Sequence, residues 1–214
     1  MKVLITGTSK GIGKATAELF IARGHNVIGI DKEEIAIYHS RYTHHRYNVD
    51  MFLPEINNVE ILINNAGVQN TGHDIQTNLV SLIKVTEKYG IQPHIKSIVN
   101  IASTSAHNGA EFPEYCASKG GVLAYTKNVA LRVAKYNATC NSISPGGVTT
   151  EMNQHIIESP KLWKAVMEES LLPKWASAEE IAEWIYFVAV VNKSMTGQDI
   201  IIDNGETSKA NFIW

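Results

Sequence analysis

A tyrosine and a lysine stand four positions apart, at Tyr115 and Lys119, in a stretch with helical spacing. This spacing places both side chains on one face of the helix. A phenol titrates at about pH 10 and is a poor base at neutral pH, but a neighbouring ammonium favours the phenolate and lowers its pKa. Ser103 lies twelve residues upstream of Tyr115, directly after an apolar run. A Tyr-x-x-x-Lys pair alone is common by chance, but the three residues together predict general acid–base chemistry.

A glycine-rich turn lies near the start of the chain. Residues Thr6–Gly13 read TGTSKGIG, between an apolar run and a helical pattern. Gly7 allows a tight turn, Gly11 lets the backbone approach a pyrophosphate, and Gly13 lets helix and strand pack closely. The helix N-terminus adds free N–H groups for the phosphates. The spacing differs from G-x-G-x-x-G and lacks the Lys-Ser/Thr pair of a P-loop, but its place at the first strand–helix junction predicts a dinucleotide site.

Asp31 follows the second apolar run, 18 residues after Gly13. In a doubly wound sheet this position lies beside the adenosine ribose, whose hydroxyls a carboxylate can bind. A 2′-phosphate there would meet a like charge. Lys10 and Lys32 are flexible, solvated ammonium groups whose attraction for a phosphate is largely screened. Asp31 therefore favours NAD(H) over NADP(H) as the cofactor.

Short apolar runs alternate with helical patterns along the chain. Several of the runs are apolar on both faces, as strands of a parallel sheet covered by helices should be. This alternation predicts an α/β fold, a single-domain Rossmann-like, doubly wound parallel sheet of about seven strands over residues 1–214. The predicted strands are Lys2–Thr6, Asn26–Ile30, His45–Val49, Glu60–Asn64, Ser97–Ala102, Ala138–Ser144 and Gln198–Ile202, and the predicted helices are Ile12–Arg23, Asp74–Tyr89, Glu114–Tyr136 and Ala178–Val191.

Composition and charge limit the class of protein. Nineteen basic and 21 acidic side chains give a net charge of −2, so no overall field attracts nucleic acid or an anionic membrane. The longest apolar run, Trp184–Val191, is too short for a membrane span, and we expect a buried helix face. Because Lys2–Thr6 already reads as a buried strand, no signal peptide fits before it, and we expect a cytoplasmic protein. Cys116 and Cys140 lack zinc-binding spacing and His44–His45 lack a third ligand, so we expect no metal.

With these motifs in view, the sequence resembles the short-chain dehydrogenases/reductases in their compact single-domain form, from Met1 to about Glu206. The resemblance implies an NAD(P)-dependent oxidoreductase that interconverts a secondary alcohol and a ketone by hydride transfer. Besides the glycine turn and the Tyr-Lys pair, the segments that match family motifs in the same order are Asn64–Gly67 (NNAG), Thr77–Leu79 (TNL), Asn100–Ser103 (NIAS), Pro145–Thr150 (PGGVTT), Met195–Gln198 (MTGQ) and Asp203–Gly205 (DNG).

The resemblance also implies roles for single residues. Tyr115 is the general acid or base, and Ser103 donates a hydrogen bond to the substrate oxygen. Lys119 holds the cofactor ribose and lowers the pKa of the tyrosine, while Asn78 fixes a water that links Lys119 to solvent. The cofactor contacts implied by the motifs are Gly7, Ser9, Lys10, Gly11, Ile12, Gly13, Asp31, Asn48, Val49, Asn65, Ala66, Gly67, Tyr115, Lys119, Pro145, Gly146, Val148 and Thr150.

The chain departs from the family pattern in the region before Asn78. Only 33 positions separate Asp31 from Asn64, and 13 separate Asn65 from Asn78. We therefore expect the helix between the second and third strands to be reduced or lost, and the segment before Asn78 to be trimmed. Asn48 stands where the family has an aspartate beside the adenine, and an amide can still bind the adenine edge.

Two other functions stay open at this point. One is an NADPH-dependent reductase of a 3-oxoacyl thioester, of the acyl-carrier-protein type, which is a common activity among similar sequences. The other is a nucleotide-sensing regulator that kept the fold and lost the chemistry, although the intact set of four catalytic side chains argues against it. The substrate is a small-molecule carbonyl or alcohol whose identity spacing does not encode, since its pocket is expected from the loops Ala106–Glu114 and Glu151–Trp175.

The remaining expectations concern self-association and the substrate pocket. Small residues along Glu114–Tyr136 suit close helix packing, and related enzymes pair this helix across a two-fold axis, so we expect a homodimer or homotetramer. The apolar tail Ala210–Trp214 could dock on a neighbouring subunit. His107 could line the substrate pocket or be a solvated loop residue, and Trp163 and Trp175 could belong to a substrate lid or to ordinary core packing.

Overall fold

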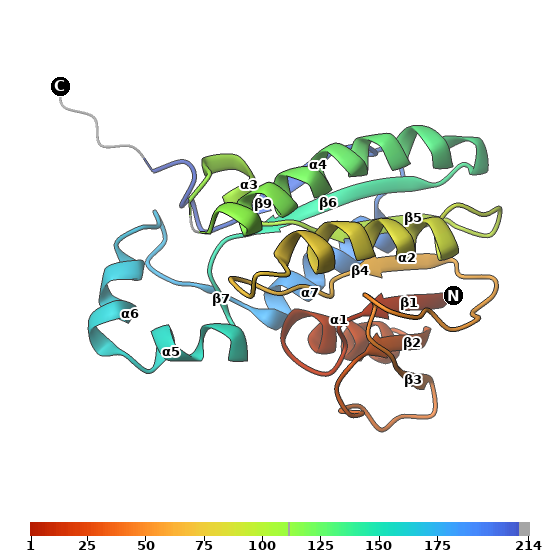
Figure 1. The fold of residues 1–214 in the computed structure, drawn as a ribbon, viewed down its shortest axis with the longest axis horizontal. Coiled ribbons are helices and arrows are strands. Elements are labelled where there is room, and N and C mark those ends of the chain that lie inside the picture. Colours follow the sequence, from red (N-terminus) through yellow and green to blue (C-terminus); the bar gives the residue numbers. More distant parts are fainter. Residues whose placement is uncertain (111, 210–214) are drawn as a thin grey trace.

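The computed structural model describes residues 1–110 and 112–209, and a seven-stranded sheet runs through its centre (Figure 1). The strands lie in the order β3-β2-β1-β4-β5-β6-β9, and all neighbouring pairs are parallel. The order reverses between β1 and β4, which is the switch point where open α/β sheets bind ligands. The predicted Rossmann-like fold is confirmed. The strands are β1 (Lys2–Thr6), β2 (Asn26–Asp31), β3 (Tyr42–Arg46), β4 (Ile61–Asn64), β5 (Ser97–Ile101), β6 (Thr139–Pro145) and β9 (Asp199–Ile202).

Helices cover both faces of the sheet, as Figure 1 shows. Val3 and Ile5 of β1 belong to the core that includes α1 and α7, whereas Leu4 belongs to the core that includes α2 and α4. All three side chains are fully buried. Successive residues of a strand point to opposite faces, so β1 contributes to two cores. The long helices are α1 (Gly11–Ala22), α2 (Leu82–Tyr89), α4 (Pro113–Val133) and α7 (Ala178–Tyr186).

Three of the predicted helices change their geometry along their length. A π-helical segment, Gln76–Ser81, precedes α2, and a second one, Phe187–Val191, continues α7. A 3-10 turn, Ala134–Tyr136, extends α4. Segments of π-helix are rare and often occur at functional sites. The first of these two segments contains one of the predicted catalytic residues, Asn78.

The apolar run Trp184–Val191 is only in part the buried helix face that the sequence predicts. Trp184, Phe187 and Val191 are 44%, 45% and 53% exposed, whereas Ile185 and Val188 are buried. The reason is geometric, since eight consecutive residues go all the way round a helix and only part of them can face the core. The exposed members form an apolar strip on the surface of α7 and its extension.

The edge of the sheet at β3 also differs from the prediction. β3 spans Tyr42–Arg46 and not His45–Val49, because Tyr42 is buried and pairs with Val27, whereas Val49 lies in the turn that follows. Among the described residues, neither the connection 32–41 nor the connection 47–60 contains a helix. This confirms the expected loss of the helix between the second and third strands and extends it to the next connection. β3 therefore forms an open edge of the sheet.

A second, small sheet holds the segment between β6 and α7. It pairs β7 (Val148–Thr149) with β8 (Ala176–Ser177), and no motif in the sequence predicts it. The segment Glu151–Trp175 that leaves and returns at this sheet forms short helices at the left of Figure 1. The remaining short elements are α3 (Ser105–Asn108), the 3-10 turn Glu151–Asn153, α5 (Gln154–Ile157) and α6 (Pro160–Met167).

Membrane spans and metal clusters can be searched for in the described residues. In the described part of the chain, every helix is too short or too polar to cross a bilayer. The same residues contain no cluster of three His, Cys, Asp or Glu side chains that could hold a metal ion. The tail Ala210–Trp214, which we expected to dock on a neighbour, lies outside the described residues.

Candidate active site

The glycine turn between β1 and α1 has the geometry that its glycines predict. Gly7 and Gly11 have φ angles of +76° and +53°, a region that side chains other than glycine rarely adopt. A Cβ atom on Gly13 would lie 1.9 Å from the carbonyl oxygen of Gly7, so only glycine lets α1 approach the turn this closely. Ile12 packs against the core below the turn. The turn therefore leads directly into the N-terminus of α1, where free N–H groups can bind phosphate.

The NNAG segment fastens the end of β4 to this turn. Asn65 Nδ2 donates to the carbonyl oxygens of Thr6 and Gly7 at 3.0 Å each, and Thr6 Oγ1 accepts hydrogen bonds from Asn65 N and Ala66 N. A Cβ on Gly7 would lie 2.9 Å from Asn65 Nδ2, so the turn and the segment are in close contact. The predicted cofactor residues of β1 and β4 thus form one rigid unit at the switch point of the sheet.

Lys119 lies in the interior at the carboxyl end of β5. Its side chain is 95% buried, its Nζ donates to the carbonyl oxygen of Ile101 at 2.9 Å, and Nζ lies 5.6 Å from the centre of the Tyr115 ring. Burial lowers the pKa of Lys119 to about 8, while the negative charge of Asp74 acts in the opposite direction. Tyr115 and Lys119 thus share one face of α4, as their spacing predicts, and burial makes the ammonium of Lys119 a stronger acid than that of an exposed lysine.

Asn78 is held by three hydrogen bonds inside the protein. Its Oδ1 accepts from Val68 N at 2.8 Å, and its Nδ2 donates to Val68 O at 2.9 Å and to Ser118 Oγ at 3.1 Å. A Cβ on Gly67 would lie 3.2 Å from Asn78 Oδ1 and 3.6 Å from Lys119 Nζ. Asn78 Oδ1 and Lys119 Nζ therefore both lie next to Gly67. The three hydrogen bonds use both the oxygen and the nitrogen of the asparagine amide.

Ser103 follows β5 at the same sheet edge. Its Oγ lies 3.0 Å from Ser105 Oγ and accepts a hydrogen bond from Ser105 N, and Ser103 is buried. The backbone on either side is tied to β6, because Ala102 N donates to Ile143 O and Thr104 N donates to Pro145 O. The hydroxyl of Ser103 thus stands on a loop whose backbone has little freedom to move.

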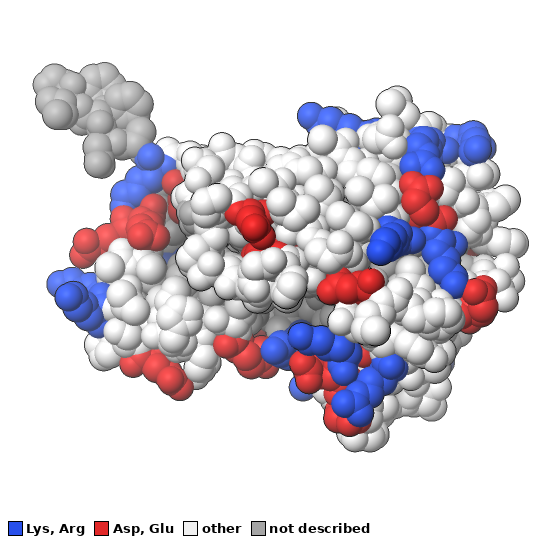
Figure 2. Space-filling view, viewed as in Figure 1, with Lys and Arg blue, Asp and Glu red and all other residues white. Residues whose placement is uncertain are grey.

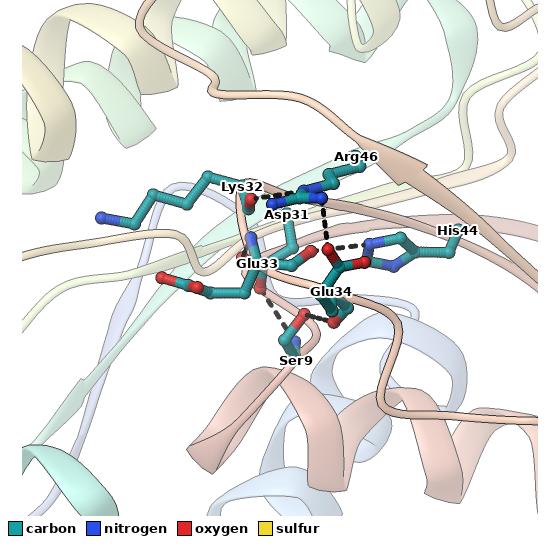
Figure 3. Close-up of polar contacts among 7 residues, drawn as sticks. All are labelled: Ser9, Asp31, Lys32, Glu33, Glu34, His44 and Arg46. Carbon is teal, nitrogen blue, oxygen red and sulfur yellow. Dashed lines mark hydrogen bonds and ion pairs between the residues drawn. The ribbon is translucent and has the colours of Figure 1, made fainter.

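The carboxylate of Asp31 lies at the end of β2, close to the glycine turn (Figure 3). Its Oδ2 accepts from Ser9 N at 2.8 Å and its Oδ1 accepts from Glu33 N at 3.0 Å. Each carboxylate oxygen can accept a second hydrogen bond, for example from a ribose hydroxyl. Figure 2 shows that charged side chains of both signs gather at the lower right, over the β2–β3 edge, while the centre of this face is largely uncharged. Lys10 is exposed and precedes α1 as its N-cap residue.

Two predicted adenine contacts lie in the turn after β3. Asn48 Oδ1 accepts a hydrogen bond from Asp50 N at 3.0 Å, so part of the amide stabilises its own turn. The side chain of Val49 is buried in the core. The carboxylate of Asp50 in turn accepts hydrogen bonds from Thr77 Oγ1 at 2.9 Å and Ser81 Oγ at 2.7 Å. Asp50 thereby connects this turn to the π-helical segment on both sides of Asn78.

The turn after β6 brings Pro145–Thr150 to the glycine turn. A Cβ on Gly11 would lie 3.3 Å from Thr150 Cγ2, and a cavity of about 400 Å³ opens beside these two residues. Glycine at Gly146 avoids a clash with Asp203, whose Cβ would lie 2.9 Å away from an added Cβ. Val148 is buried in β7. The cavity adjoins the phosphate end of the predicted site and is not the substrate pocket, since neither Ser103 nor Tyr115 lines it.

The structure gives side-chain contacts for His107 and for the pair of Trp163 and Trp175. His107 Nε2 lies 2.8 Å from Asp199 Oδ2, so this exposed side chain is held against β9. The rings of Trp163 and Trp175 meet edge to face at 5.4 Å. A Cβ on Gly147 would lie 2.1 Å from Trp175 Nε1, so this tryptophan covers the turn after β6.

Asp74 belongs to this site, although it is not part of the motifs named in the sequence analysis. It is 99% buried and accepts hydrogen bonds from Asn70 N at 2.7 Å and Thr71 N at 2.9 Å. Burial acts to raise the pKa of Asp74, but the backbone N–H groups and the Thr71 hydroxyl outweigh it and hold this pKa below its usual value. The signal available in the sequence was its place one helical turn before Asn78.

Comparisons with known proteins cover almost the whole chain. A family model described as enoyl-(acyl carrier protein) reductase matches residues 48–207. The 3-oxoacyl-[acyl-carrier-protein] reductase FabG of Chlamydia pneumoniae is 29% identical over an alignment of 242 residues, which covers 96% of this chain and 96% of the relative. Cyclopentanol dehydrogenase of Comamonas testosteroni is 28% identical, with 96% of both chains covered. A 4-hydroxyisoleucine dehydrogenase mutant complexed with NADH and succinate shares the fold, with a TM-score of 0.84 at 24% identity over 99% of this chain and 100% of that one.

Proposed function

Because the chain belongs to the short-chain dehydrogenase/reductase family, we propose that it interconverts a secondary alcohol and a ketone with NAD(H) as the preferred cofactor. The protein is an enzyme that acts on CH–OH donors with NAD(P) as acceptor. One observation carries the proposed alcohol–ketone chemistry. The buried Lys119 ammonium lies beside the Tyr115 ring at the carboxyl end of β5, where Ser103 also lies.

The residues present fit a dinucleotide. The glycine turn leaves no room for a Cβ at Gly13 and presents the N-terminus of α1, which suits a pyrophosphate. Asp31 would bind the adenosine ribose, and the turn at Asn48 and Val49 would lie along the adenine. Further contacts would come from Gly7, Ser9, Lys10, Gly11, Ile12, Asn65, Ala66, Gly67, Tyr115, Lys119, Pro145, Gly146, Val148 and Thr150.

The protein's own residues would handle the proton. When bound, the nicotinamide ring supplies or accepts the hydride. Ser103 would donate a hydrogen bond to the substrate oxygen, and Tyr115 would deliver a proton to that oxygen in reduction or remove it in oxidation. The Lys119 ammonium would stabilise the phenolate form of Tyr115. Asn78 would act as a positioning residue, because its amide fixes Val68 and Ser118 around Lys119.

A turnover assay with both reduced cofactors tests this function. The purified 214-residue chain is mixed with NADH or NADPH and a panel of cyclic, aliphatic and thioester carbonyls, and loss of reduced nicotinamide absorbance is followed. We expect a ketone to be reduced with NADH more efficiently than with NADPH. Absence of turnover with every carbonyl, and with the corresponding alcohols and oxidised cofactors, would contradict the proposal.

A second candidate is an NADPH-dependent reductase of a 3-oxoacyl thioester. The similarity to the 3-oxoacyl-[acyl-carrier-protein] reductase of Chlamydia pneumoniae favours it. The Asp31 carboxylate argues against it, because a 2′-phosphate there meets a like charge. Efficient turnover of an acetoacetyl thioester with NADPH, and slower turnover of simple ketones, would select this candidate over the first.

We also expect the enzyme to form a homodimer or homotetramer. Leu131 at the outer face of α4 is 81% exposed, and Trp184, Phe187 and Val191 form the apolar strip on α7. Exposed apolar surface of this kind often marks an interface. Light scattering at micromolar concentration should give a mass of two or four chains, and a mass near the 23.6 kDa of one chain would contradict this expectation.

A further inference from the structure

The segment 31–34, which begins at the last residue of β2, is held by hydrogen bonds from the glycine turn. Ser9 N donates to Asp31 Oδ2 at 2.8 Å, and Ser9 Oγ donates to the carbonyl oxygen of Glu34 at 2.9 Å. One residue of the turn therefore fixes both ends of the segment. The backbone position of Glu34 is therefore fixed by the glycine turn itself.

The same segment is held from β3 on its other side. Arg46 Nε donates to the carbonyl oxygen of Lys32 at 3.2 Å, and His44 Nε2 lies 3.0 Å from the carbonyl oxygen of Glu33. Figure 3 shows the two β3 side chains reaching across to the segment. Because the helix that would connect β2 to β3 is missing, these contacts replace it as the support of the segment.

Arg46 stands beside Asp31 and is already engaged. The two residues are register partners in the parallel strands β2 and β3, so their side chains start from the same sheet edge. The Nη1 atom of Arg46 forms an ion pair with Glu34 Oε1. A guanidinium group is well suited to phosphate, because it is always charged and can donate two parallel hydrogen bonds. A cation suited to a 2′-phosphate is thus neutralised by a carboxylate of the same segment.

We propose that Glu34 is a second determinant of cofactor selectivity, which acts by keeping Arg46 from binding a 2′-phosphate. This inference rests on the proposed function, since it requires the adenosine ribose to lie at Asp31. The segment Asp31–Glu34 carries three carboxylates and one lysine, a net charge of −2. Asp31 repels the 2′-phosphate by direct contact, and Glu34 removes the counter-charge that would compensate.

The exposure of the ion pair sets the size of the expected effect. The side chains of Arg46 and Glu34 are 60% and 75% exposed, so water and salt weaken their attraction. Removing the Glu34 charge should therefore change the affinity for a 2′-phosphate by about two- to fivefold. The effect should be clearest in Asp31→Ser, where the direct repulsion is absent.

The test compares dissociation constants of NADH and NADPH, measured by nicotinamide fluorescence on the full chain. The variants are Asp31→Ser alone and the same variant combined with Glu34→Gln or with Glu33→Gln. Glu33 is the matched control, because it loses the same charge one position away, and among the described residues it forms no ion pair with Arg46. We expect Glu34→Gln to tighten NADPH about two- to fivefold and leave NADH unchanged, and Glu33→Gln to change NADPH by less than about 1.5-fold.

A third substitution separates the mechanism from a general charge effect. Arg46→Gln added to the Asp31→Ser, Glu34→Gln variant should remove the gain in NADPH affinity. Equal gains for Glu34→Gln and Glu33→Gln, or a gain that survives Arg46→Gln, would overturn this inference alone. If the wild-type protein binds neither NADH nor NADPH, the proposed function itself is wrong.

Discussion

The two ends of the proposed cofactor site are built in opposite ways. At the catalytic end, Asn78 and Lys119 are 1% and 5% exposed, and they are fixed by backbone atoms and by Ser118. At the adenosine end, the segment after β2 is solvent-exposed and held by hydrogen bonds and an ion pair to the edge strand β3. Two core-forming helices cover the first end, whereas the helices that would flank β3 are missing among the described residues.

This difference separates what is fixed in the enzyme from what can vary. A charge buried among hydrogen-bonded groups is costly to disturb, because its neighbours cannot turn to water. An exposed ion pair contributes little and can be exchanged. We therefore expect substitutions at the catalytic end to change the rate or the stability by large factors, and substitutions at the adenosine end to change which cofactor is used.

The largest effect is expected for Tyr115→Phe. The substitution removes the hydroxyl that would transfer the proton and keeps the ring that Lys119 contacts. General acid–base catalysis supplies roughly 10²–10⁴-fold, so kcat should fall by about that factor. Dissociation constants for NADH, measured in parallel, should stay close to those of the wild type. Retention of more than about a tenth of kcat, when chemistry limits the rate, would show that Tyr115 is not the proton donor.

Lys119→Met tests the burial at the catalytic end through stability. The pKa of Lys119 in the folded protein is about 8, below the ordinary 10.5. The buried charge therefore lowers the free energy of unfolding below pH 8. As pH rises from 8 to 10.5, the folded state loses this proton first and the free energy of unfolding increases relative to neutral pH.

The measurement is the unfolding free energy of wild type minus that of Lys119→Met, from denaturant titrations. This difference should rise by about 2 kcal/mol between pH 7 and pH 10, because the methionine cannot titrate. The buried groups whose pKa is raised, such as Tyr89 and Cys140, are present in both proteins and cancel in the difference. If this difference in unfolding free energy does not change with pH, Lys119 is hydrated. The catalytic end would then be no more buried than the adenosine end.

At the adenosine end, Asp31→Ser should change selectivity and leave the rate with NADH largely intact. A contact repulsion of a few kcal/mol corresponds to about a hundredfold in kcat/KM, and the serine removes it. The ratio of kcat/KM for NADH and NADPH should therefore fall to within about tenfold of unity. A wild type that prefers NADPH, or a ratio unchanged by the substitution, would show that Asp31 does not contact the ribose.

The sequence predicts the parts of this molecule that local patterns determine. The apolar runs of β1 and β5 and the glycine turn were found because each is a short segment with its own steric requirement. The edge strand was misplaced, because the burial of Tyr42 depends on pairing with β2 and not on its own neighbours. The contact of His107 is not predictable for the same reason, since its partner Asp199 lies 92 residues away.

The candidate site shows the same limit. Tyr115, Lys119 and Ser103 could be grouped because their spacing and strand ends converge on one edge of a parallel sheet. Two other features of the site depend on how the shortened segment before Asn78 folds back onto the protein. They are the burial of Asp74 and the hydrogen bonds that two hydroxyl groups donate to Asp50, and the spacing of residues in the sequence predicts neither. The ion pair of Glu34 and Arg46 likewise arises only when β3 takes its place beside β2.

The smallest effect is expected for Lys10→Gln, which compares a second lysine with Lys119. Lys10 is exposed and precedes α1, where its ammonium is surrounded by water and salt. Its attraction for a 2′-phosphate is therefore screened, and the ratio of kcat/KM for NADH and NADPH should change by less than about threefold. Lys14→Gln in α1, where Lys14 pairs with Glu18, is the matched control and should also change the ratio by less than about threefold. Since the Debye length falls to about 3 Å at 1 M salt, any difference between Lys10→Gln and wild type should disappear in high KCl. A tenfold change that persists there would mean that Lys10 contacts the phosphate directly, and the adenosine end would then contain a desolvated charge like the catalytic end.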